Sequence, residues 1–319
     1  MPDDANKPNA YEQEALDEIR AWKEPQGRSM FGRALDFMDK PFEAFKKAAD
    51  KVPYADILDQ ALAKVVDLVN SAARKTVPRE TILTQFDPPL SCLEDLHSLD
   101  LQTIDAKVEA LKGQYARAAL AEGGAAGVAT PLAPMVAIPG DVALLVTLNL
   151  KAINTYATYY GFDTTLEEER LFALQVLMLA SSATESAKGP VMANMAKVAR
   201  DAAQRKAWEH LNEQFILRQI KKIAEALGIK LTKAKLANLA PVAGAVISGG
   251  FNAYYTDKVC TAAYQLYRER FLARKYGSHL ISDKVGALPE PAYEALLEAP
   301  NEGDEAKEAV KEVSSKERD

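Results

Sequence analysis

The most constraining feature of this chain is a run without any charged side chain from Gly123 to Gly140. Glycine and alanine crowd its first half, and three prolines, the last of them Pro139, interrupt its second half. A single acid, Asp141, separates this run from a further uncharged segment that ends at Leu150. A second uncharged stretch, rich in the same small residues, covers 236–256. Two stretches of this kind are expected to leave water, either for the protein core or for lipid.

The composition of the two stretches favours a protein core over two membrane spans. A span needs about 20 consecutive, predominantly apolar residues. The first stretch has few large apolar side chains besides its prolines, and the second contains Asn238, Ser248, Asn252 and two tyrosines. Transfer of asparagine to hydrocarbon is unfavourable, and glycine and alanine gain little from it. We therefore expect two Gly/Ala-rich helical segments packed against each other in the centre of a domain.

Small residues recur at intervals of four in both stretches, which places each set on one face of a helix. These sets are Ala119, Gly123 and Gly127 in the first stretch, and Ala240 with Gly244 and Ala245 with Gly249 and Ala253 in the second. Small side chains allow two helix backbones to approach closely. The spacing predicts that the Gly123/Gly127 face packs on the Ala245/Gly249 face.

The remainder of the chain has the apolar periodicity of amphipathic helices, and no segment shows the alternation of a strand bounded by hairpin turns. The predicted fold is all-α: one helical domain over 11–285, between a disordered lead at 1–10 and a disordered, charged tail at 286–319. The segment 298–319 has eight acids and four bases, so it supplies −4 of the net charge of −6. The near-neutral remainder gives no indication of a nucleic-acid partner.

Pro139 and Asp141 are predicted to begin a helix. Proline is tolerated at the first helical position, and a carboxylate in the first turn is favoured by the helix dipole. This helix would end at Tyr160, with Gly161 as its C-cap. Three roles for Asp141 remain open: a cap at the helix start, an ion pair with a base such as Lys151 or Arg268, and a general acid or base.

No recognisable catalytic signature is present: GxSxG, HExxH, Walker A and Rossmann fingerprints are all absent. A hydrolase that combines Asp141 with Lys151 or Ser181 is a conceivable alternative. His97 follows Cys92 by five residues, which is a poor zinc spacing, so no metal and no cofactor are predicted. The acids at 167–169 fit the start of a helix better than a catalytic cluster.

Both cysteines, Cys92 and Cys260, are expected to be buried thiols in a reducing compartment. The polar, acidic N-terminus lacks the basic region and apolar core of a signal peptide, so a cytoplasmic location is expected.

Several short motifs, taken in order, resemble the EcsC protein family. They are Tyr11-Glu12 with Trp22, the glycines from Gly123 to Gly127, Pro139-Gly140-Asp141, Tyr160-Gly161-Phe162-Asp163, Pro241 to Gly244 and Ala245 with Asn252, and Tyr267 to Leu272 with Lys275-Tyr276. The resemblance extends from about Tyr11 to Tyr276. One departure is Asn149-Leu150-Lys151, where the family often has an arginine. The family takes its name from a bacterial gene that lies beside the genes for an ABC transporter. Its molecular activity is unassigned, so the resemblance implies no catalytic residues.

The segment from Ser29 to Lys51 suggests a surface for a membrane. Its apolar residues, including Phe31, Phe42 and Phe45, fall on one helical stripe with basic residues around them, which suits a helix in a membrane interface. A surface helix packed on the core is the alternative. The leading hypothesis is a non-enzymatic cytoplasmic protein that associates peripherally with a membrane or a membrane protein, on the inner face of the cell membrane. The alternatives are a membrane-proximal hydrolase and a fully soluble helical scaffold.

Overall fold

The computed structural model describes residues 7–23, 54–72, 79–125, 133–181 and 246–281, together with parts of 191–232. The longer helices are α1 (Ala10–Lys23), α3 (Tyr54–Ala72), α5 (Leu101–Val108), α6 (Leu111–Ala125), α7 (Ala133–Tyr159), α8 (Glu167–Ser181) and α11 (Val246–Tyr276), and α4 (Arg79–Leu83) is a single short helix. Short 3₁₀ helices cover Leu93–Ser98 and Ser278–Leu280. Every regular element in these ranges is helical, so the predicted all-α fold class is confirmed.

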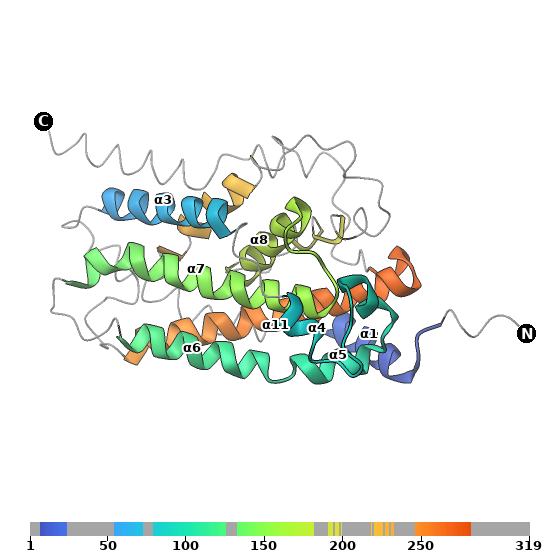
Figure 1. Cartoon of the computed structure of the whole chain (residues 1–319). Helices are drawn as coiled ribbons and strands as arrows, with labels where there is room; N and C mark the ends of the chain where they lie inside the picture. The colour runs from blue at the N-terminus through green and yellow to red at the C-terminus, as the bar shows by residue number, and fades with distance from the viewer. Residues whose placement is uncertain are drawn as a thin grey trace, which may run out of the picture.

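Helix α11 is the central element of the fold. Figure 1 shows α6, α11 and α7 running side by side, with α3 packed along α7. Helices α6 and α11 are antiparallel, because Lys112 near the start of α6 pairs with Asp257, while Asp105 in the preceding α5 pairs with Arg268 further along α11. This register puts Gly123 at the level of the first turns of α11, which contain Gly249.

The described residues include only part of the predicted contact between the two glycine faces. Gly127, Ala245 and Gly244 lie outside the described residues, as does the segment from Ser29 to Lys51. The contact between the faces, and the loss of stability expected for Gly127→Leu from overpacking, therefore stay predictions. None of the described helices is both long enough and apolar enough to cross a membrane.

The start of α7 differs from the predicted one. The helix begins at Ala133, six residues before Pro139, so Pro139 lies inside the helix and Asp141 lies beyond its first turn. The interpretation of Asp141 as a helix N-cap is therefore wrong. Proline at an interior position removes a backbone hydrogen bond and usually ends a helix. Here the uncharged segment before Pro139 continues the helix, and Pro139 itself is buried.

The apolar periodicity from about Leu101 to beyond Glu122 predicts one long helix, but the structure divides this segment into two. Helix α5 ends at Val108, and α6 begins at Leu111 after a two-residue turn. The apolar stripe, with Ile104, Val108 and Leu111 all buried, continues through the turn. That continuity explains why periodicity alone predicted one helix. The turn places Glu109 beside a pocket that is described below.

The C-terminus of α7 has the predicted glycine cap. Gly161 has φ of 81°, in the left-handed region where glycine is favoured. The N–H of Phe162 donates to the carbonyl of Ala157 at 2.9 Å, and the N–H of Gly161 donates to the carbonyl of Thr158 at 3.1 Å. These two bonds are those of a Schellman motif, which satisfies the last carbonyls of the helix. The turn directs Phe162 back into the core, where it is 6% exposed.

His97 packs against this cap and accounts for its tight geometry. Its Nε2 lies 3.0 Å from the carbonyl of Gly161, so Nε2 carries the proton that is donated. Its ring contacts those of Phe162 and Phe271, and its Nδ1 has no hydrogen-bond partner within the described residues. Burial, with help from the positive charge of Arg274, lowers the pKa of His97 to about 4. A second proton would place an unpaired charged N–H in the core.

We expect this histidine to make the stability of the fold dependent on pH. Because the folded-state pKa is near 4 and the unfolded value is about 6.5, the unfolded chain takes up a proton first as the pH falls. The free energy of unfolding should decrease between about pH 6.5 and 4 and gain no further slope from this group below that window. Denaturant unfolding of wild type and His97→Gln at several pH values measures this. An equally steep pH dependence in both proteins would contradict the assignment.

Candidate functional site

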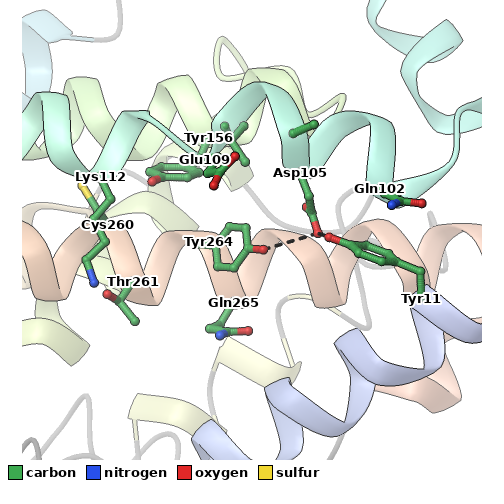
Figure 2. A pocket seen from close by; sticks show the side chains of 12 residues that line it. Tyr11, Gln102, Asp105, Glu109, Lys112, Tyr156, Cys260, Thr261, Tyr264 and Gln265 are labelled. Atoms are coloured by element: carbon green, nitrogen blue, oxygen red, sulfur yellow. Dashed lines mark hydrogen bonds between the residues drawn. The ribbon is translucent and has the colours of Figure 1, made fainter.

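A pocket of about 630 Å³ lies where α5 and α6 meet α11. Its walls come from helices that are far apart in the sequence, as Figure 2 shows. The lining side chains are Tyr11 from α1, Gln102, Asp105, Ala106 and Val108 from α5, Glu109 from the α5–α6 turn, Lys112 from α6, Tyr156 from α7, and Cys260, Thr261, Tyr264 and Gln265 from α11. This volume is in the usual range for a small-molecule site.

The carboxylate of Asp105 is the most heavily bonded group of the pocket. It accepts hydrogen bonds from the hydroxyls of Tyr160 at 2.6 Å, Tyr11 at 2.9 Å and Tyr264 at 3.4 Å. The Nε atom of Arg268 lies 2.9 Å from the Oδ2 atom of Asp105. Four groups therefore surround two oxygens. We conclude that Asp105 holds four helices together and has little capacity left for a ligand.

Burial is the largest single influence on the pKa values of this cluster. It raises the pKa of Asp105 above its ordinary value, and the charge of Arg268 and the three tyrosine hydroxyls oppose that shift. Burial and the neighbouring carboxylate together raise the pKa of Tyr11 to about 12. The pKa of Arg268 is raised, because its attraction to Asp105 and its hydrogen bond to Glu18 outweigh the effect of burial. Arg268 thus stays charged and the tyrosines stay protonated donors at neutral pH.

The other end of the pocket is lined by groups with fewer bonds. Tyr156 is 2% exposed, and no described residue makes a hydrogen bond with its hydroxyl. In Figure 2 this hydroxyl points toward the end of the pocket where Cys260 lies. Burial and the negative charge of Asp257 raise the pKa of the Cys260 thiol to about 12. A thiol of this kind is not ionised at neutral pH, so Cys260 is a poor nucleophile.

Ion pairs from α11 fix the helices that carry the pocket. Arg268, Glu269 and Arg270 are consecutive and all buried, at 2–4% exposure. Besides Asp105, Arg268 binds Glu18 of α1 at 2.8 Å, and Lys23 of α1 lies 2.5 Å from Glu269. Arg270 donates to both oxygens of Glu169 in α8, at 2.5 and 2.7 Å. Each of the three residues thus forms an ion pair between α11 and a neighbouring helix.

The acids of the first turn of α8 lie where the sequence predicts them, but one of them has a further role. The three acids at 167–169 do begin a helix, as the sequence predicts. Glu169, however, is buried in the pair with Arg270, so its main role is to bind α11.

The sequence-predicted positions are only partly brought together. Tyr160 joins the candidate site through its hydrogen bond to Asp105, and Gly161 caps the same helix. Asp163 accepts a hydrogen bond from Arg79, outside the pocket. Asn252 is buried within α11, near Gly249. Gly123, Pro139 and Asp141 lie in other parts of α6 and α7.

The residues of the hydrolase alternative do not form a nucleophilic site in the described structure. The hydroxyl of Ser181 donates to the carbonyl of Leu177 at 2.8 Å and lies 2.8 Å from the hydroxyl of Tyr255. Lys151 is exposed to solvent, and Asp141 is half-buried. Arg268, one suggested partner of Asp141, binds Asp105 and Glu18 instead.

The two cysteines have different environments. Both are free thiols. Cys260 is buried, as expected, whereas Cys92 is exposed at the start of a 3₁₀ helix, so the prediction of a buried Cys92 is wrong. Within the described residues, no three side chains of histidine, cysteine, aspartate or glutamate gather to hold a metal ion.

Sequence reasoning missed Asp105, Tyr156 and Tyr264 as site residues. One signal was available: three charged residues in succession, from Arg268 to Arg270, occupy a helix whose neighbouring positions are apolar and aromatic. Buried charges need partners. The two arginines therefore need acidic partners on other helices, and Asp105 is one of the acids that could serve.

Comparison with known proteins supports one family. The EcsC protein family matches residues 13–272. The chain is 23% identical over 266 residues to "Uncharacterized protein YdbA" of Bacillus subtilis (strain 168), which covers 80% of this chain and 90% of that protein. It is 28% identical over 154 residues to "Protein EcsC" of the same organism, which covers 47% of this chain and 59% of that protein. No solved structure matches. Since the family match spans most of the sequence, including all the pocket-lining residues except Tyr11, this chain belongs to the EcsC protein family.

Proposed function

We propose that this protein is a non-enzymatic helical protein that associates peripherally with a membrane surface, on the cytoplasmic side. The supporting observation is the outward face of α7. Gly140, Leu144, Thr147 and Leu148 share one side of the helix and form what we call the α7 outer stripe. Leu144 is 56% exposed, Thr147 is exposed, and Gly140 and Leu148 are half-buried. The water-facing side of a helix is normally charged, whereas this side of α7 carries no charge until the exposed Lys151, one turn after Thr147.

The size of the stripe predicts weak, reversible binding. Full burial of a leucine side chain contributes about 1.5–3 kcal/mol, and only Leu144 is largely exposed. Such a surface needs a second attraction for stable attachment, as single lipid anchors do. The Ser29–Lys51 segment supplies a small one: its five bases exceed its four acids by one, and each base near an anionic surface contributes about 1 kcal/mol. We therefore expect binding to depend on anionic lipid and to weaken with salt.

The first experiment is flotation of the full chain with vesicles of phosphatidylcholine and phosphatidylglycerol. Leu144→Glu should reduce the vesicle-bound fraction about tenfold. The variant loses the free energy gained when the leucine side chain leaves water, and it adds a negative charge to the stripe. Leu166→Glu is the matched control, since Leu166 is 46% exposed but lies in the turn before α8, away from the stripe. Its binding should equal that of wild type.

Two results would contradict this proposal. One is complete recovery of the wild-type protein in the unbound fraction with anionic vesicles at low salt, which would favour the soluble scaffold. The other is binding only to vesicles that contain membrane proteins, which would favour a protein partner. Little supports the hydrolase alternative, because the Ser181 hydroxyl is held by Leu177 and Tyr255 and the Cys260 thiol is not ionised.

A further inference from the structure

We propose that the pocket between α5, α6 and α11 is a binding site for a small organic cation that carries one positive charge and an oxygen atom, of the amino-alcohol class. The charges of the pocket wall, its aromatic rings and the hydroxyl of Tyr156 favour a ligand of this class. The proposal is independent of the proposed membrane association, because none of these residues lies on the α7 outer stripe.

The pocket has one carboxylate without a compensating charge. Arg268 is shared between Asp105 and Glu18, and the Nζ atom of Lys112 lies 3.0 Å from the Oδ1 atom of Asp257. Glu109 makes no ion pair and no side-chain hydrogen bond with another described residue, although it lines the same space. The charges around the pocket are therefore negative in sum, which suits a positively charged ligand.

The rings of three tyrosines line the same pocket as Glu109. Tyr11, Tyr156 and Tyr264 line the pocket, and the rings of Tyr156 and Tyr264 meet edge to face with centroids 6.4 Å apart. Tyr264 already receives the guanidinium of Arg268 at 4.5 Å from its centroid. Clusters of aromatic rings beside a carboxylate attract ammonium groups through the ring quadrupole and exclude anions. Figure 2 shows Glu109 and Tyr156 together above Tyr264.

The hydroxyl of Tyr156 suggests that the ligand has an oxygen atom. The Tyr156 side chain is 2% exposed, and no described residue provides a partner for its hydroxyl. The hydroxyl itself is not sealed from solvent, and it faces the pocket, where a ligand can reach it. Burial raises its pKa well above the usual value, so it remains a donor at neutral pH. A hydroxyl or ester oxygen near the ammonium group of the ligand would accept this bond.

Isothermal titration calorimetry on the full chain tests the proposal with choline and ethanolamine as probes. The matched control ligand is 3,3-dimethylbutan-1-ol, which has the shape and oxygen of choline without its charge. We expect choline or ethanolamine to bind with a Kd of about 1 mM or below, and the neutral alcohol to bind at least about tenfold more weakly. No heat from either amine up to about 50 mM, or equal affinity for the neutral alcohol, would overturn the proposal.

Two variants separate the residues involved. Glu109→Gln should weaken choline binding about tenfold, because it removes the unpaired charge. Glu80→Gln, at another exposed acid outside the pocket, should leave it unchanged. Tyr156→Phe should weaken choline but leave tetramethylammonium, which lacks an oxygen, unaffected. Loss of affinity in Glu80→Gln as large as in Glu109→Gln would contradict the assignment.

A lipid headgroup and a free amino alcohol share this chemistry, and competition distinguishes them. Displacement of choline by phosphatidylcholine vesicles would assign the site to the lipid headgroup. Choline binding that vesicles do not affect would assign it to the free molecule, and either result supports the proposal.

Discussion

Replacement of Arg270 by methionine is expected to lower the free energy of unfolding by about 3–5 kcal/mol. The guanidinium of Arg270 is bound to both oxygens of Glu169, and the two residues are 4% and 5% exposed. It also lies over the rings of Phe162 and Phe172, at 4.1 and 4.2 Å from their centroids. The methionine would keep part of the packing but leave the Glu169 carboxylate buried without a partner. Urea unfolding followed by circular dichroism measures the difference.

Two controls separate a buried ion pair from charge in general. Arg20→Met breaks a pair with Asp17 of similar length, 2.8 Å, but these side chains are 50% and 62% exposed. It should cost less than about 1 kcal/mol. The double variant Arg270→Met with Glu169→Leu should recover much of the loss, because it removes the unpaired charge as well. If Arg270→Met unfolds at the same urea concentration as Arg20→Met, the pair does not stabilise the fold.

The prediction for α11 shows how far helical periodicity extends. Val259, Ala263 and Leu266 have the spacing of one helical face, and the helix that contains them ends at Tyr276. Gly277 follows with φ of 119°. The same pattern could not show that the charged residues from Arg268 to Arg270 are buried. Periodicity describes one helix alone, whereas burial of all its sides results from the helices packed around it.

The candidate site was harder to predict, because its members come from four parts of the chain. Tyr160 was identified through a short motif, but its partner Asp105 lies 55 residues earlier and Tyr11 still further away. Only tertiary packing brings these groups together. Local rules also failed where packing opposed them: Pro139 fitted a helix start by its type, yet the helix continues through it.

The second large effect is expected for Gly161→Ala, which should lower the free energy of unfolding by about 2–4 kcal/mol. A left-handed backbone costs an L-residue about 1–2 kcal/mol. A Cβ at this position would also lie 2.7 Å from Nε2 of His97 and 3.0 Å from the carbonyl oxygen of Leu93. The ring of His97 would have to move, and the hydrogen bond between His97 and the Gly161 carbonyl would be lost.

Gly140→Ala is the matched control for this substitution. Gly140 lies inside α7, the helix that Gly161 caps, and a Cβ at Gly140 would meet no atom within 4 Å. Alanine should stabilise that position by about 0.5–1 kcal/mol, because it restricts the unfolded chain and favours a helix. The double variant His97→Ala with Gly161→Ala distinguishes the two costs: if the clash with the ring matters, alanine at 161 should be less harmful in the His97→Ala background than in wild type. Equal unfolding midpoints for wild type and Gly161→Ala would show that neither the backbone conformation nor the contact with His97 constrains this turn.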